Sequence, residues 1–278
     1  MNAEFHLPGP LPPGFSLRTA IRCARLVDRI YGFYQQWSDA GKPPPERITF
    51  RPIRIGRSTL VFTAPFWRTL TYHRPGAPGS RRGGRRPGPE VVEHTPAGAC
   101  ARQGRRLFIV FRGTLGPAEK ITNWMATRRD AVFDDLAGGG VHRGFHRCYA
   151  STREAIMKFI RDETDAATTI RIVGYSLGGA LASLAAMDIA TYGLPYRALE
   201  VFTFASPLVG SRRWAGHYER QRLRSWRIAN ERDLVAKVPP PLFGYRHVGV
   251  PILFSSRKGD APHSLLNTYL PALRRNLL

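Results

Sequence analysis

The stretch "IRIVGYSLGGALASLAAMDIA", residues 170–190, constrains the fold of this chain more than any other segment. It opens with an apolar, β-branched run that is typical of a buried strand, and it continues as an Ala- and Leu-rich run that is typical of a helix. The pattern switches at Ser176, with Gly174 two residues before it and Gly178 two residues after it. This spacing predicts a tight turn that holds the serine in a strained conformation at a helix N-terminus, where the helix dipole favours a developing negative charge.

Strand patterns alternate with helix patterns through the second half of the chain. We predict strands in "LFIVFRGT", "TIRIVGYS", "ALEVFTFASP", "SWRIAN" and "YRHVGVPILF", and helices between them and in the last segment, "HSLLNTYLPALRRNLL". Such alternation favours an α/β fold with a mostly parallel central sheet that helices cover on both faces. The 278 residues, 43% of them apolar, suffice for one domain of this kind.

Two segments near the N-terminus differ from this pattern. Residues 1–17 are rich in Pro and Gly and are expected to form a flexible tail, which leaves a single domain over residues 18–278. An amphipathic helix is predicted directly after the tail, with Ser16 as its N-cap. Residues 74–106 combine Arg, Gly and Pro, and we expect a flexible basic insertion there with one short strand at "EVVEH".

The charge of the chain is its most unusual compositional feature. A formal net charge of +22 favours contact with anionic partners such as phospholipid or nucleic acid, although an Arg-rich genome would give the same bias. Three widely separated cysteines form no disulfide framework. The N-terminus lacks the pattern of a Sec signal peptide, and no apolar run is long enough to span a membrane. We therefore expect a soluble protein made in the cytoplasm, or one exported without such a peptide.

A serine hydroxyl is a weak nucleophile unless a neighbouring base takes its proton. In strand–turn–helix serine sites the partners follow in the order serine, acid, histidine. Three histidines follow Ser176 in this chain: His217 in a predicted surface helix, His247 in a strand pattern, and His263 on a loop before the final helix. Because loops on a rigid scaffold commonly carry catalytic groups, His263 is the predicted base.

The predicted acid is Asp233, which follows the strand "SWRIAN". Active-site groups of parallel sheets collect at the carboxyl ends of strands, and an acid there would orient the imidazole and stabilise its charged form. Asp188 lies too far along the helix after Ser176, and Asp260 is expected to shape the loop of His263. A solvated loop carboxylate is the alternative interpretation of Asp233. The remaining acids after Ser176 are Glu200, Glu219 and Glu231.

An oxyanion site is the third requirement of this chemistry. The backbone N–H of Leu177, the residue after the serine, is the first predicted donor. The second is expected from the loop after the strand "LFIVF", where Thr114 would donate through its N–H and its hydroxyl. Gly113 would let the two segments approach each other closely.

Six segments in this order resemble the class 3 lipases, the fungal-type triacylglycerol lipase family with an α/β-hydrolase fold. They are "FRGT", "VHRGF", "GYSLGGALA", "FTFASPLVG", "NERDLVAKVPP" and "PHSLLNTYL", within residues 107–270. The resemblance implies the catalytic triad Ser176, Asp233 and His263, with Thr114 and Leu177 as oxyanion donors. The chain departs from the family pattern at Tyr175, where histidine is usual, in its short acid-to-histidine segment, and in its Arg-rich insertion.

The resemblance also places a lid after the oxyanion strand, in residues 115–130. Ile121, Trp124 and Met125 would form one apolar helix face there, suited to opening at a lipid surface or to packing permanently on the core. His142 and His146 have the i, i+4 spacing of metal ligands, but no third ligand is apparent and their segment matches the family pattern. We expect them to be structural, and we expect neither a metal nor a cofactor.

The residues together predict a serine ester hydrolase, a lipase or esterase that cleaves carboxylic esters of acyl lipids through an acyl-enzyme. A phospholipase A-type enzyme on anionic membranes is an alternative, since the chain is so basic, and a thioesterase or acyltransferase would use the same residues. A different class of protein would bind nucleic acid or another polyanion. It would use residues 74–106 and 212–232, with the interspersed aromatic residues Trp214, Tyr218 and Trp226.

Overall fold

A computed structural model describes residues 10–56, 59–73, 90–114, 133–135 and 139–277. Its largest element is a seven-stranded sheet with the strand order β13-β11-β9-β8-β5-β4-β3. The strands from β5 to β13 run parallel, whereas β3 and β4 pair antiparallel at one edge. The predicted fold class, a mostly parallel sheet covered by helices, is therefore confirmed. Strand bounds are β3 Pro65–His73, β4 Glu90–Gln103, β5 Arg106–Phe111, β8 Thr169–Tyr175, β9 Ala198–Phe204, β11 Arg224–Asn230 and β13 Val250–Phe254.

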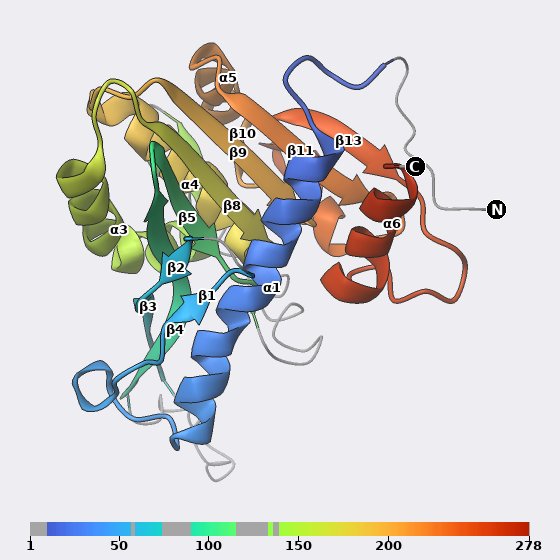
Figure 1. Ribbon diagram of the computed structural model, residues 1–278. Coiled ribbons are helices and arrows are strands. Elements are labelled where there is room, and N and C mark those ends of the chain that lie inside the picture. The colour runs from blue at the N-terminus through green and yellow to red at the C-terminus, as the bar shows by residue number, and fades with distance from the viewer. Residues whose placement is uncertain (1–9, 57–58, 74–89, 115–132, 136–138, 278) are drawn as a thin grey trace, which may run out of the picture.

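Helices cover both faces of this sheet (Figure 1). The helix α1 (Leu17–Asp39) crosses one face together with α6 (Leu270–Arg275), and the apolar side chains of both helices share a core with those of β8, β9 and β11. The other face packs against α3 (Arg143–Glu163), α4 (Leu177–Tyr192) and α5 (Arg212–Arg220). Two separate apolar clusters, one on each face, are the arrangement that continuous apolar strand patterns predict.

The amphipathic N-terminal helix forms as its sequence predicts. Ser16 caps α1 by accepting a hydrogen bond from the Thr19 backbone N–H at 3.3 Å. The residues before it differ from the flexible tail that we expected, because Phe15 is buried and its ring packs against those of Phe202 and Trp226. One aromatic side chain thus anchors the end of the predicted tail to the sheet, and residues 1–9 lie outside the described part of the chain.

The prediction of a flexible insertion over residues 74–106 is wrong for its second half. Glu90–Gln103 form β4, which pairs with β3 on one side and with β5 on the other. Its inward residues are small, and Ala97, Ala99 and Ala101 are all buried. A Cβ on Gly98 would lie 2.2 Å from the Val110 carbonyl oxygen, so glycine is required at this close contact. Composition alone does not indicate such a strand, because its buried residues are alanine and glycine and not large apolar side chains. Residues 74–89 lie outside the described part.

Short elements complete the described chain. A four-stranded sheet has the order β12-β10-β7-β6, and β1 pairs with β2. Their bounds are β1 Ile53–Arg54, β2 Val61–Phe62, β6 Phe133–Asp135, β7 Gly140–His142, β10 Gly210–Ser211 and β12 Tyr245–Arg246. Helical turns are η1 Pro45–Arg47, η3 Val235–Lys237, η4 Pro241–Phe243 and η5 Leu265–Tyr269. The predicted lid segment, residues 115–130, lies outside the described residues.

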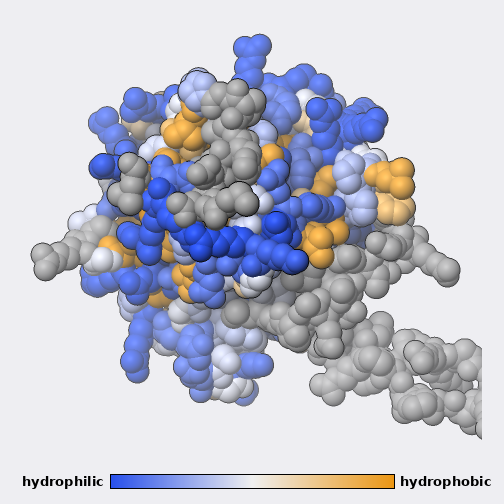
Figure 2. All heavy atoms as spheres, turned by 90° about the vertical axis from the view of Figure 1, so that its right-hand side faces the viewer, coloured by the Kyte–Doolittle hydropathy of each residue, from blue (hydrophilic) through white to orange (hydrophobic). Residues whose placement is uncertain are grey.

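The surface of the described residues agrees with a strongly charged chain. The face in Figure 2 is mostly hydrophilic, and its apolar side chains lie in small separate groups. The aromatic residues proposed above for nucleic-acid contact are not on the surface: Trp214, Tyr218 and Trp226 are at most 3% exposed. That part of the polyanion-binding prediction is wrong, because these rings fill the cores on the two sheet faces. None of the described helices is both long enough and apolar enough to span a membrane.

Candidate active site

The serine turn lies between β8 and α4 and has a strained backbone. Ser176 has φ +56° and ψ −125°, a conformation that costs an L-residue on the order of 1–3 kcal/mol. The flanking glycines permit the turn: a Cβ on Gly174 would lie 1.9 Å from the Gly178 carbonyl oxygen. A Cβ on Gly178 would lie 2.5 Å from the carbonyl oxygen of Arg112, the residue after β5. The two glycines therefore allow the close backbone approach that this turn requires.

His263 lies beside this serine, although 87 residues separate them in the chain. Its Nε2 is 2.9 Å from the Ser176 Oγ, and its Nδ1 is 2.8 Å from the Asp233 Oδ2. An ionised carboxylate can only accept, so the proton is on Nδ1 and the unprotonated Nε2 faces the serine hydroxyl. The structure thus brings the three predicted side chains into one continuous relay, with the imidazole oriented as a base.

Asp233 is completely buried at the carboxyl end of β11. A buried carboxylate requires several hydrogen bonds to offset the loss of its hydration. Its Oδ1 accepts from the Val235 N–H at 2.9 Å, and its Oδ2 accepts from the Tyr269 hydroxyl at 2.7 Å as well as from His263. The charge is therefore held by three donors, and only one of them is the histidine.

Two residues that sequence reasoning missed connect the acid to the histidine loop. The Tyr269 hydroxyl accepts from the Asn230 backbone N–H at 3.1 Å while it donates to Asp233. The Asn230 side chain donates to the Ser256 Oγ at 3.0 Å and to the Pro262 carbonyl at 2.9 Å. These bonds fix the end of β11 against the loop that carries His263. The segments "SWRIAN" and "PHSLLNTYL" contain both residues, but nothing in either pattern indicates that they touch.

Tyr175, which departs from the family pattern, contacts the same loop. Its hydroxyl donates to the backbone carbonyl of His263, and its ring stacks on the imidazole at 5.2 Å between centroids. Burial holds the pKa of this phenol far above its usual value, so it stays a neutral donor. Tyr175 therefore holds His263 in position through two contacts, one from its ring to the imidazole and one from its hydroxyl to the backbone carbonyl.

One predicted oxyanion donor directly follows the serine, and the other directly follows Gly113, which lies against the turn. Leu177 begins α4 and is buried, and Thr114 is half-buried after the end of β5. Gly113 lies against the turn, since a Cβ there would be 3.1 Å from that of Ser176. The Gly113 N–H donates to the Tyr31 hydroxyl of α1 at 2.9 Å. The backbone of this loop is therefore held close to the serine.

Arg112 fixes the same loop from within the protein. Its guanidinium donates to the backbone carbonyls of Pro96 and Gly113 and lies 4.6 Å from the ring centre of Tyr34. Burial lowers its pKa to about 10, so the group remains charged at neutral pH. A buried cation and two tyrosines of α1 thus hold the residues that precede Thr114.

Other sequence candidates have structural roles. The Nδ1 of His142 accepts from the N–H groups of Gly144 and Phe145 and caps α3. His247 Nε2 lies 2.9 Å from the Ala236 carbonyl, and burial together with the nearby Arg227 lowers the pKa of His247 to about 3. Among the described residues, no group of three His, Cys, Asp or Glu side chains is placed to hold a metal ion.

Three of the other candidate acids have partners outside the relay. Asp188 accepts from the Tyr149 hydroxyl and from Arg153 near the C-terminal end of α4, away from the serine turn, and Asp260 accepts from the Arg257 N–H within its own loop. Glu200 pairs with Arg171 near the start of the parallel strands. None of these three contacts His263, which leaves Asp233 as its carboxylate partner.

The fold and the serine turn together define the α/β-hydrolase class. A family model described as "Lipase (class 3)" matches residues 108–243. Over these residues, just under half of its length, the chain is similar to the class 3 lipase family.

Curated relatives are similar over part of their length. A lipase of Rhizomucor miehei is 31% identical over 151 residues, covering 52% of this chain and 40% of the relative. The secreted mono- and diacylglycerol lipase 1 of Fusarium solani is 31% identical over 145 residues, covering 51% and 42%. Phospholipase A1-II 4 of Oryza sativa subsp. japonica is 34% identical over 192 residues, covering 60% and 48%. The chain thus spans less than half the length of each of these relatives.

Solved structures support the fold over most of the chain. A crystal structure of an MDLA protein of Penicillium cyclopium has a TM-score of 0.61 at 18% identity, covering 93% of this chain and 86% of its own. The native propeptide complex of the Rhizomucor miehei lipase has a TM-score of 0.55 at 21% identity, covering 88% and 77%. At this level of identity the likeness establishes the shared architecture.

Proposed function

We propose that this chain is a serine ester hydrolase that cleaves carboxylic esters of acyl lipids. The observation that supports it most is the relay of hydrogen bonds, 2.9 Å from Ser176 to His263 and 2.8 Å from His263 to Asp233. This geometry meets the requirement for an activated nucleophile: a base within hydrogen-bond reach, oriented by a third group. The lipase activities in the names of the relatives point to the same chemistry.

In the proposed mechanism the Ser176 Oγ attacks the ester carbonyl carbon while His263 Nε2 takes its proton. The N–H groups of Leu177 and Thr114 stabilise the negative charge on the carbonyl oxygen. Collapse of the intermediate breaks the bond to the alcohol, which leaves with the proton from His263 and leaves the acyl group on the serine. Water then attacks the acyl-enzyme with the same histidine as base, and the carboxylic acid departs.

A phospholipase A1-type activity is a second candidate, and two observations favour it. One of the matched relatives is named as a phospholipase A1 of rice. The net charge of +22 would concentrate the protein at anionic lipid surfaces.

Contact with a lipid surface is part of both candidate functions. Leu234, next to Asp233, is 72% exposed, and Leu266, three residues after His263, is 51% exposed. Exposed apolar side chains beside a site are typical of surfaces that meet lipid or protein. We propose that these two leucines enter the lipid interface when the site engages its substrate.

The test compares the wild type with Ser176→Ala and with a matched control, Ser183→Ala. Ser183 is also buried and lies on the same helix, but its hydroxyl donates to the Gly179 carbonyl and not to the relay. Turnover of p-nitrophenyl esters should disappear in Ser176→Ala and persist in Ser183→Ala. Equal turnover by the wild type and Ser176→Ala would reject the proposal. Emulsified triglyceride and anionic phospholipid vesicles then separate lipase from phospholipase activity.

A further inference from the structure

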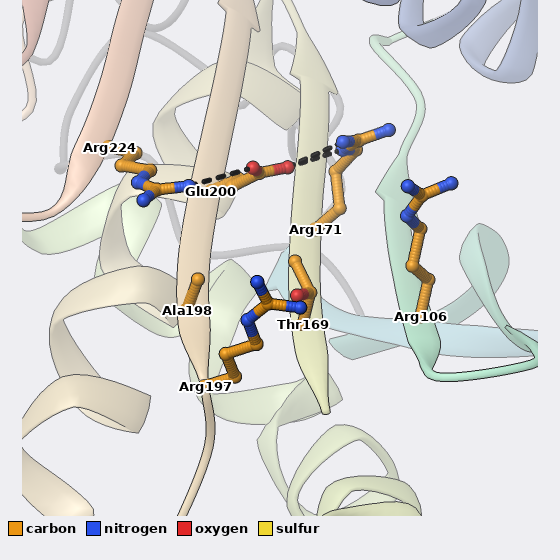
Figure 3. A pocket seen from close by; sticks show the side chains of 7 residues that line it. All are labelled: Arg106, Thr169, Arg171, Arg197, Ala198, Glu200 and Arg224. Carbon is orange, nitrogen blue, oxygen red and sulfur yellow. Dashed lines mark hydrogen bonds and ion pairs between the residues drawn. The ribbon is translucent and has the colours of Figure 1, made fainter. Parts of the chain in front are cut away.

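A pocket of about 210 Å³ lies at the opposite end of the parallel strands from the serine turn (Figure 3). Its lining is dominated by charged side chains, and most of them are arginines. The residues that form its polar lining are Arg106, Thr169, Arg171, Arg197, Glu200 and Arg224. This arginine pocket shares no residue with the candidate active site.

The register of the sheet gathers these residues. Arg106 pairs with Thr169, while Arg171 pairs with Glu200, which in turn pairs with Arg224. Side chains two residues apart on a strand point to the same face, so both rows lie on one face of the sheet. Arg197 joins them from the position just before β9. The strands β5, β8 and β11 thus contribute one arginine each near their amino ends, and the residue before β9 contributes the fourth.

The Arg171 guanidinium is held in place by protein contacts alone. Arg171 is 8% exposed, and its Nε and an Nη both donate to the Glu200 Oε2. Its guanidinium also lies 5.8 Å from the ring centre of Phe108 and 5.7 Å from that of Phe202. A guanidinium held by a carboxylate and two aromatic rings loses little freedom on binding.

The remaining charges are poorly balanced. The other oxygen of Glu200 lies 3.7 Å from Arg224, and the Arg224 side chain is 63% exposed. Within the described parts of the chain, Arg106 and Arg197 have no ion pair, and both are exposed. A single carboxylate therefore faces four guanidinium groups, which leaves three positive charges in excess around one pocket.

We propose that the arginine pocket binds a small anion that carries a phosphate group. Guanidinium groups match the oxygens of phosphate through paired N–H donors, and several converging arginines select a multiply charged group. The Thr169 side chain, drawn beside Arg197 in Figure 3, adds a neutral hydroxyl to the same lining.

The phosphate could come from a soluble molecule or from a lipid headgroup, and the position of the pocket favours the soluble source. β8 has seven residues, and the six steps from Thr169 in the pocket to Tyr175 beside the serine span about 20 Å at ~3.3 Å per residue. A headgroup in the pocket would turn the serine away from the bilayer. This choice of source rests on the proposed function, whereas the presence of a phosphate site does not.

The experiment titrates the full-length protein with pyrophosphate and with inorganic phosphate by calorimetry. Salt is kept at about 0.15 M, where diffuse attraction is screened beyond about 8 Å. Arg106→Ala/Arg197→Ala removes two exposed pocket charges. Arg25→Ala/Arg213→Ala removes two exposed charges outside the pocket and serves as the matched control. Flotation with phosphatidylcholine vesicles containing phosphatidic acid tests the lipid source.

We expect saturable 1:1 binding of pyrophosphate that weakens about tenfold to a hundredfold in the pocket variant and stays unchanged in the control. Flotation should be the same for both variants. Equal weakening in both variants, or absence of saturable binding to the wild type, would overturn the site. Selective loss of flotation in the pocket variant would overturn the soluble source. Each result is independent of ester turnover.

Discussion

The charged side chains near the two ends of the parallel strands differ in burial and in balance. At the carboxyl end a fully buried carboxylate, Asp233, has three hydrogen-bond donors, and its relay ends on the Oγ of Ser176. At the amino end one carboxylate, Glu200, faces four arginines, and much of that charge is exposed to water. The buried charge at the first site orients one side chain, whereas the excess charge at the second site remains available to a ligand.

Asp233→Asn provides the strongest test of this contrast. An amide in place of the carboxylate favours the wrong imidazole tautomer, so the proton moves to Nε2 and His263 no longer accepts from the serine. We expect kcat to fall about 10⁴-fold with the fold retained. Steady-state kinetics on a soluble ester, beside circular dichroism, measure both quantities. A variant that keeps full kcat would show that the carboxylate has no role in the relay.

The corresponding change at the amino end is Glu200→Gln. It leaves the buried guanidinium of Arg171 without its charged partner, so we expect the free energy of unfolding to fall by about 3 kcal/mol, with the kcat of the folded protein preserved. Urea denaturation followed by fluorescence gives the stability. A loss of kcat as large as that of Asp233→Asn would contradict the claim that Glu200 affects stability and not turnover.

Tyr269→Phe sharpens the account of the carboxyl end. The change removes one of three donors to the Asp233 carboxylate and the acceptor of the Asn230 N–H, while the buried ring stays. Since a hydrogen bond to a charged group contributes about 1.5–3 kcal/mol, we expect kcat to fall about tenfold to a hundredfold. Unchanged kcat and KM would mean that the two remaining donors hold the carboxylate equally well.

The smallest expected effect is a change of stability with pH that comes from His247. The pKa of His247 is about 3 in the fold and about 6.5 in an unfolded chain, so between these values the unfolded chain binds more protons. Stability is therefore complete above pH 6.5 and is lost as the pH falls. We expect a loss of about 1 kcal/mol between about pH 7 and pH 5.5, and a smaller one in His247→Gln. Identical losses in both proteins would assign the effect to other groups.

Sequence patterns single out the three side chains that meet at the carboxyl end of the sheet, because each of them lies in a local pattern. The glycines around Ser176, the position of Asp233 after a strand, and the loop of His263 are each visible in a few consecutive residues. The lining of the arginine pocket is not visible in this way. Arg171 and Glu200 are 29 residues apart, and only the strand register places them side by side.

The other features that sequence patterns do not predict also depend on contacts between segments far apart in the chain. The predicted strand at "EVVEH" is the first part of β4. The rest of β4 was not predicted, because alanine and glycine fill a narrow space between β3 and β5, where composition suggests a flexible segment. The hydroxyl of Tyr269 reaches an acid 36 residues away, and the departure at Tyr175 acquires a role only when its ring meets His263. Contacts between distant segments decide these features, and a single sequence does not encode them as a pattern.

The central claim is that His263 activates Ser176 as a nucleophile. A fluorophosphonate probe tests it most directly, since it reacts with activated serines and forms a stable adduct that peptide mass spectrometry can locate. We predict a single adduct on Ser176, formed at least about 10³-fold more slowly in His263→Ala. An adduct on another serine, or equal labelling rates in the wild type and His263→Ala, would contradict the account.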